Sequence, residues 1–191
     1  MTFVETIPDD KATGDVALLY QESRDQNGYL QNFVQAFSLR PEVLRAWQQL
    51  NGAIKARDVR RYELATLAAA RRLRSSYCAL AHGKVLADQF LGEEAVAALP
   101  TGLDEADRAV VELAEHVVDD ATSITEADID RLRTLGLSDG EIVDVVLAAA
   151  ARCFFSKTLD ALGAEPDSAF AGLDSAFLDA LVVGRPIATA P

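Results

Sequence analysis

The longest helical pattern in this chain lies between Ser138 and Gly163. Ser138 and Glu141 have the spacing of a capping box, in which two side chains satisfy free backbone N–H groups at a helix start. A run rich in alanine, valine and leucine follows, and Gly163 stands where a glycine commonly ends a helix. Two charged residues interrupt the run, which is also too short to cross a bilayer. The pattern predicts a long, largely buried helix over residues 141–162.

Helix signals fill the rest of the chain as well, and strand signals are few. Aromatic residues make up 7% of a sequence dominated by alanine and leucine, which suits packed helices better than a β-sandwich. Asp15 is expected to cap the first helix, and Gly28 marks the turn after it. The expected helices cover approximately residues 15–24, 42–56, 59–74, 75–92, 104–118, 126–136 and 177–183. We expect an all-α, single-domain helical bundle over residues 1–191, with a flexible C-terminal tail after about residue 184.

The chain carries 30 acidic and 18 basic side chains, a net charge of −12. This charge repels nucleic-acid phosphates and anionic membrane surfaces, so we expect no nucleic-acid partner and no membrane partner. The first residues lack the basic start and apolar run of a secretory signal. The two cysteines, Cys78 and Cys153, lie far apart, so reduced thiols and a cytoplasmic location are expected. The cysteines and histidines show no metal-ligand pattern, and we expect no metal site and no cofactor.

The chemically richest segment is residues 75–82, which reads SSYCALAH. His82 follows Cys78 by four residues, so the two share one helix face. If Ser75 caps this helix, Cys78 lies in its first turn, where free N–H groups and the helix dipole favour a thiolate. Glu63 lies twelve residues before Ser75, in the preceding helical run. These three groups predict an activated cysteine, in which His82 takes the thiol proton and Glu63 orients the imidazole.

Each of these residues also has an ordinary structural interpretation. A lone cysteine in an alanine-rich helix is usually a core residue, and Ser75 serves as an N-cap in either case. His82 and Glu63 can likewise be helix residues without a catalytic role. The combined spacing, rather than any single residue, favours the catalytic interpretation. Cys153 fits a core cysteine between apolar neighbours; its alternative is a substitute resolving thiol, which requires a Cα within about 7 Å of that of Cys78.

The pattern Glu63…Ser75-x-x-Cys78-x-x-x-His82 resembles the alkylhydroperoxidase D and carboxymuconolactone decarboxylase superfamily, whose redox members carry E-x11-C-x-x-C-x-x-x-H. The flanking residues support the resemblance, which covers most of residues 15–167 and points to the peroxidase-related branch. It implies an alkylhydroperoxidase-D-like helical bundle. The supporting segments are ELATLA (63–68), AHGKVLA (81–87), GYLQN (28–32) with RPE (40–42), LGLSDGEI (135–142) and LDALG (159–163).

The resemblance also implies roles for individual residues. Cys78 corresponds to the cysteine that attacks peroxide, with His82 and Glu63 as its proton relay. Ser75 stands where the redox members carry the resolving cysteine, and Tyr77 where some members place a second histidine, so both are accessory candidates. We therefore expect a peroxide-directed, antioxidant thiol peroxidase of one-cysteine type, whose sulfenic acid is reduced by an external thiol or dithiol.

Two other functions stay open from the sequence. One is an oligomeric binding protein that has lost turnover, and the other is an enzyme of the carboxymuconolactone decarboxylase type. Consumption of Cys78 by peroxide separates the first of these from a peroxidase. Several helices are apolar over more than one stripe, as around residues 145–151, so we expect a homo-oligomer.

Overall fold

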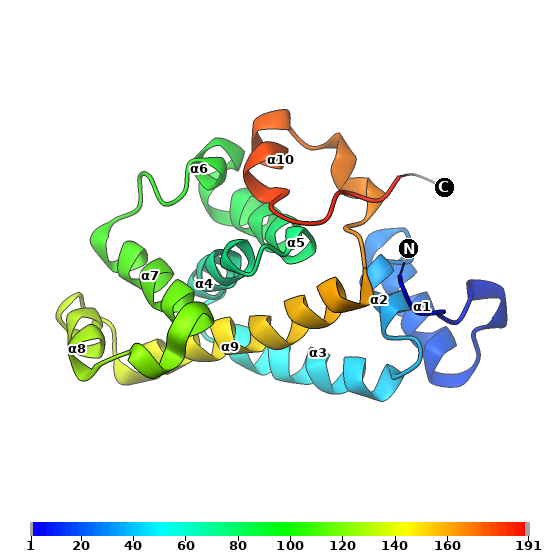
Figure 1. The fold of residues 1–191 in the computed structure, drawn as a ribbon, viewed down its shortest axis with the longest axis horizontal. Helices are drawn as coiled ribbons and strands as arrows, with labels where there is room; N and C mark the ends of the chain where they lie inside the picture. Colours follow the sequence, from blue (N-terminus) through cyan, green and yellow to red (C-terminus); the bar gives the residue numbers. More distant parts are fainter. Residues whose placement is uncertain (1, 190–191) are drawn as a thin grey trace.

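The computed structural model describes residues 2–189, which contain helices and no β-strand (Figure 1). This confirms the expected all-α class. The α-helices are α1 (Gly14–Asn27), α2 (Asn32–Ala36), α3 (Pro41–Lys55), α4 (Val59–Arg72), α5 (Ser76–Leu86), α6 (Glu93–Ala97), α7 (Glu105–Asp120), α8 (Glu126–Thr134), α9 (Asp139–Leu162) and α10 (Ser175–Leu181). Short 3-10 turns are η1 (Asp9–Lys11), η3 (Ala121–Ser123) and η4 (Ser168–Gly172), and η2 (Ala87–Leu91) is a π-helical turn.

Helix α4 forms the centre of the bundle and contacts α5, α7 and α9. Every residue from Tyr62 to Ala70 is buried, so α4 is covered on all sides rather than on one face. Alanine and leucine dominate this stretch, and their small or flexible side chains let three helices approach the same axis. This position explains how a charged residue of α4, Glu63, becomes fully buried.

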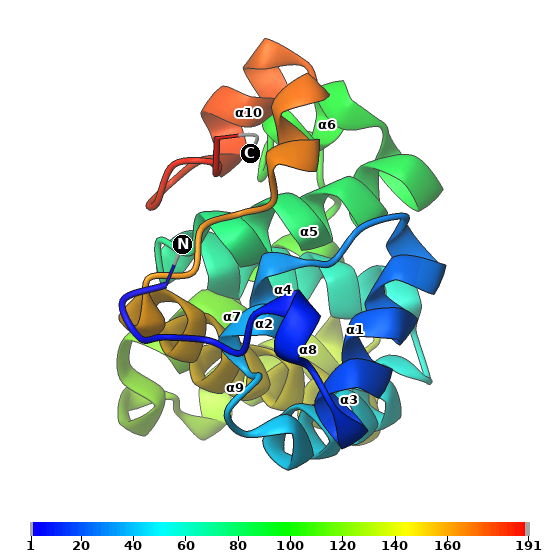
Figure 2. The same cartoon turned by 90° about the vertical axis from the view of Figure 1, so that its right-hand side faces the viewer.

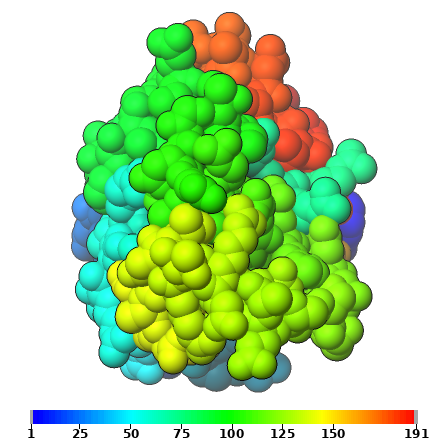
Figure 3. Space-filling view, turned by 90° about the vertical axis from the view of Figure 1, so that its left-hand side faces the viewer, coloured from blue at the N-terminus to red at the C-terminus, as the bar shows by residue number. Residues whose placement is uncertain are grey.

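Helix α9 runs through the bundle as predicted and also contacts α3 and α7 (Figure 1). Both halves of its capping box form, because the Ser138 hydroxyl accepts from the backbone N–H of Glu141 and the Glu141 carboxylate accepts from that of Ser138. Gly163 ends the helix with a φ of 78°, a left-handed conformation that favours glycine. Figure 3 shows the opposite end of the molecule, where α8 lies beside the start of α9.

Several predicted boundaries need correction. Asp15 does not cap α1: the N-cap is Thr13, and Asp15 lies in the first turn, where the helix dipole also favours an acid. The helix predicted over 75–92 changes register at Ala87, and a π-helical turn leads to Gly92, whose φ of 83° ends it. Wider i→i+5 hydrogen bonds cannot be distinguished from α-helical ones by a hydrophobic pattern.

The C-terminal region packs on α5 and α6 through α10 (Figure 2). A Cβ atom at Gly83 would lie 2.5 Å from a methyl carbon of Leu181, so a glycine is needed on α5 for this close approach. Beyond α10, Arg185 donates to the carbonyl oxygen of Asp160 at 2.7 Å, and the N–H of Ala188 donates to that of Pro166 at 2.9 Å. The flexibility expected after residue 184 stays a prediction, and residues 190–191 lie outside the described range.

Within residues 2–189, none of the helices combines the length and the hydropathy that crossing a membrane requires.

Candidate functional site

A cavity of about 290 Å³ opens beside the first turns of α5, with walls from α2, α3 and α9. Its lining combines aromatic rings with a thiol, an imidazole, a guanidinium and several amides. The lining residues are Gln31, Phe33, Trp47, Gln48, Asn51, Gly52, Tyr77, Cys78, Ala81, His82, Arg152, Phe155 and Phe170.

Cys78 lies in the first turn of α5 and is 2% exposed. Ser75 is the N-cap residue by position, as predicted, but its hydroxyl makes no cap hydrogen bond. The backbone N–H groups of this turn are therefore not satisfied by a side-chain cap. They remain available to favour negative charge near the sulfur.

Arg152 of α9 donates the hydrogen bond that the structure gives the Cys78 sulfur, with 3.7 Å between Nη1 and Sγ. It is 2% exposed, and its Nη2 donates to the Asn51 side-chain oxygen and to the Tyr62 hydroxyl, both at 3.2 Å. The guanidinium carbon lies 5.1 Å from the Trp47 ring centroid, within cation–π range. The sequence motifs do not point to Arg152. Its signal was a single basic residue in the middle of an apolar helical run.

His82 and Glu63 are brought together, as their spacing predicted. His82 Nδ1 lies 2.6 Å from one oxygen of Glu63, and Lys55 Nζ donates to the other oxygen, also at 2.6 Å. An ionised carboxylate only accepts hydrogen bonds, so Nδ1 carries the proton and Nε2 keeps a free lone pair. Lys55, which the sequence analysis missed, supplies the charge that balances Glu63 in the protein interior.

The surroundings set the charge of each partner. Burial lowers the pKa of His82, and the charge of Arg152 lowers it further, which outweighs the opposing influence of Glu63. Burial raises the pKa of Glu63, but the hydrogen bonds and charges of His82 and Lys55 outweigh it and lower this pKa below its usual value. At neutral pH the arrangement is therefore a neutral imidazole held by a carboxylate. An imidazole in this state can accept a proton.

His82 and Cys78 both line the cavity, and Glu63 lies behind the imidazole. The hydrogen bond to the Cys78 sulfur comes from Arg152 rather than from His82, so the proton relay through His82 stays a prediction. Tyr77 presents its ring to the cavity, while its hydroxyl donates to the buried carboxylate of Asp167. Burial and Asp167 raise the pKa of Tyr77 well above 10, so this hydroxyl stays protonated and ties α5 to residues after α9.

Cys153 is half-buried and follows Arg152 on α9, but it does not belong to the cavity lining. Burial raises the pKa of its thiol, which disfavours the reactive thiolate. Both cysteines are free in the structure. A resolving role for Cys153 stays a prediction.

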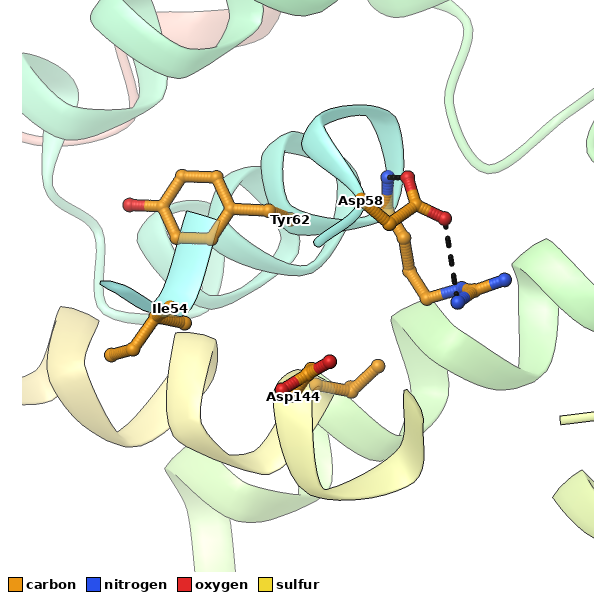
Figure 4. Close-up of a pocket in the computed structure, with 6 residues that line it drawn as sticks. Ile54, Asp58, Tyr62 and Asp144 are labelled. Atoms are coloured by element: carbon orange, nitrogen blue, oxygen red, sulfur yellow. Dashed lines mark hydrogen bonds and ion pairs between the residues drawn. The ribbon is translucent and has the colours of Figure 1, made fainter. Parts of the chain in front are cut away.

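Tyr62 lines a separate, much smaller pocket. Figure 4 shows this pocket of about 10 Å³, the space of a single water molecule, with Ile54, Asp58, Tyr62 and Asp144 around it. The Tyr62 hydroxyl donates to Asn51, which in turn accepts from Arg152. These hydrogen bonds link Tyr62 and Asn51 to Arg152 on the cavity side.

No family model matches the chain, and no curated protein matches it. Comparison with solved structures does find similar folds. An uncharacterized peroxidase-related protein from Ralstonia eutropha JMP134, described as an alkylhydroperoxidase AhpD core, is 20% identical with a TM-score of 0.77, over 88% of this chain and 94% of the other. A second uncharacterized peroxidase-related protein, from Silicibacter sp. TM1040, is 20% identical with a TM-score of 0.72, over 88% and 91%.

The debrominase Bmp8 shares this fold as well. A cysteine-to-alanine variant of Bmp8, in complex with 2,3,4-tribromopyrrole, is 15% identical with a TM-score of 0.74, over 95% of this chain and 98% of the other. The fold therefore occurs in proteins with different activities, and the site must decide the function. The chain has the alkylhydroperoxidase-D-like fold, as its sequence pattern implied.

Proposed function

We propose that this protein is a thiol oxidoreductase that reduces small organic peroxides at Cys78. The observation that supports this most directly is the placement of the thiol. Cys78 lines an aromatic cavity together with a guanidinium and a neutral imidazole that a carboxylate orients. Thiolate chemistry needs a proton acceptor and a stabilised negative charge, and this cavity supplies both.

In the proposed reaction, His82 accepts the thiol proton at Nε2, and the sulfur of Cys78 attacks one oxygen of the peroxide. A sulfur–oxygen bond forms, the oxygen–oxygen bond breaks, and the leaving alkoxide takes the proton from His82. The products are an alcohol and the sulfenic acid of Cys78. An external dithiol then reduces the sulfenic acid through a mixed disulfide, with release of water. Ser75 cannot form a disulfide with Cys78, so in this proposal a thiol from outside the chain reduces the sulfenic acid.

A second candidate is reductive dehalogenation of a small aromatic ring. Five aromatic side chains line the cavity: Phe33, Trp47, Tyr77, Phe155 and Phe170. In this alternative the sulfur of Cys78 takes the halogen, the ring carbon takes a proton, and an external dithiol restores the thiol while halide leaves. The similar fold of the debrominase Bmp8 motivates the test.

Intact mass spectrometry after one equivalent of cumene hydroperoxide, with and without dimedone as a sulfenic-acid trap, tests the proposal. The parent and the Cys153→Ser variant are expected to gain one oxygen or one trap molecule, and Cys78→Ser is not. Halide release from a brominated phenol with dithiothreitol tests the second candidate in parallel. If Cys78 reacts in neither assay, a binding role replaces both proposals.

A further inference from the structure

Arg152 carries a positive charge into the cavity without an acidic partner. Among the lining residues it is the one fully charged side chain, since His82 is neutral at neutral pH. Its hydrogen-bond acceptors, the side chains of Asn51, Tyr62 and Cys78, are uncharged in their ordinary forms. Within residues 2–189, no carboxylate forms an ion pair with it, and its Nε makes no hydrogen bond.

A buried cation with neutral partners is costly, and proteins usually pair such a group with an anion. The chain has 30 carboxylate side chains, yet those near this cavity are occupied elsewhere. Glu63 is bound by Lys55 and His82, and Asp167 by Tyr77. Contacts of the guanidinium with the faces of Trp47 and Phe155 offset part of this cost. The unsatisfied Nε shows that the guanidinium retains capacity for one more acceptor.

The sulfur of Cys78 does not fully meet this need. Its distance of 3.7 Å from Nη1 is long for a charge-assisted hydrogen bond, so the sulfur leaves much of the charge of the guanidinium uncompensated. Aromatic rings lie next to the guanidinium of Arg152. The rings of Trp47 and Phe155 stack with centroids 4.7 Å apart and planes 12° apart, and Phe33 meets Phe155 edge-on.

We propose that the cavity binds small planar aromatic acids, with the carboxylate on Arg152 and the ring against the aromatic side chains that line the cavity. A volume of about 290 Å³ accommodates a single-ring molecule. The consequence for catalysis rests on the proposed function. The preferred substrates of Cys78 are then organic peroxides, or aryl halides, that carry such a ring and a negative charge. Arg152 is thereby a specificity-determining residue that holds the substrate beside the sulfur.

Trp47 provides the assay, because it is the one tryptophan of the chain and it lines the cavity. Its fluorescence is titrated at pH 7.5 with benzoate, benzamide and benzylamine, which share a ring and differ in charge. Benzoate is expected to saturate the signal at a concentration at least tenfold lower than benzamide, and benzylamine is expected to bind more weakly still. Equal affinities for benzoate and benzamide, or no saturation with benzoate, would overturn the proposal.

Variants then identify the anion partner. Arg152→Gln is expected to remove the preference for benzoate, and Arg185→Gln, which alters an arginine bound to the Asp160 carbonyl, is expected to keep it. If Arg152→Gln does not fold, the comparison of benzoate, benzamide and benzylamine on the parent chain still tests whether the cavity prefers an anion. The preference is expected to persist in Cys78→Ala, since it does not depend on thiol chemistry. The two proposals can fail separately. If the chain prefers benzoate but peroxide does not oxidise Cys78, the proposed function is wrong and the binding site for aromatic acids remains.

Discussion

The charge balance at Glu63 leads to a quantitative prediction for Lys55→Met. Glu63 is 0% exposed, and its two oxygens accept from Lys55 and from His82, each at 2.6 Å. Without Lys55 the buried carboxylate keeps one neutral partner. Breaking a fully buried ion pair costs about 3–5 kcal/mol, and Lys55 is 35% exposed, so we expect a loss of roughly 2 kcal/mol at pH 8.

The expected loss depends on pH through His82. In the parent chain the pKa of His82 is lowered, so below about pH 6.5 the unfolded chain binds a proton that the folded chain does not, and stability falls. In Lys55→Met, the imidazole faces an uncompensated carboxylate, its pKa rises, and its proton supplies the missing charge. The stability difference between variant and parent should therefore shrink as pH falls below about 6.5, by up to about 1.4 kcal/mol per pH unit.

Urea unfolding followed by circular dichroism at pH 8.0 and 5.5 measures both quantities. Lys84→Met is the matched control: Lys84 pairs with Asp88 at 2.8 Å on the surface, and its loss should change stability by less than about 0.5 kcal/mol. A loss below about 0.5 kcal/mol in Lys55→Met at pH 8, or an equal loss at both pH values, would refute the charge-balance argument.

Three further predictions follow from the site and the surface. His82→Ala should slow iodoacetamide alkylation of Cys78 at pH 7 by about a hundredfold without unfolding the chain, as expected for loss of a general base, and an unchanged rate would exclude the relay. Ser75→Cys should form a disulfide with Cys78 on oxidation. Its stability should stay close to that of the parent, because Ser75 makes no cap hydrogen bond to lose; a persistent pair of free thiols under oxidant would show that the two positions are not in bonding reach. Leu147 is 43% exposed between Val143 and Phe154 on α9, so light scattering should show an oligomer for the parent and a 20.5 kDa monomer for Leu147→Asp; a monomeric parent would contradict the expected self-association.

The fold class followed from local signals that each act within a few residues. A capping box at Ser138, a glycine at position 163 and an apolar run between them define α9 without reference to the other helices. The spacing of Glu63, Cys78 and His82 likewise placed the candidate chemistry on two consecutive helices. The same signals do not separate an α-helix from a π-helical turn, because both have similar hydrophobic patterns. The end of α5 at Leu86 was therefore not predicted.

The environment of the thiol depended on tertiary structure. Arg152 is separated from Cys78 by 74 residues, and Lys55 reaches Glu63 from the end of a different helix. A helical pattern shows which side of α9 is apolar, but not which helix covers that side. Once α9 packs against α4 and α3, its single buried arginine meets a sulfur, two neutral oxygens and two aromatic faces. Burial then determines the charges, because desolvation and the neighbouring guanidinium act over distances that only packing defines.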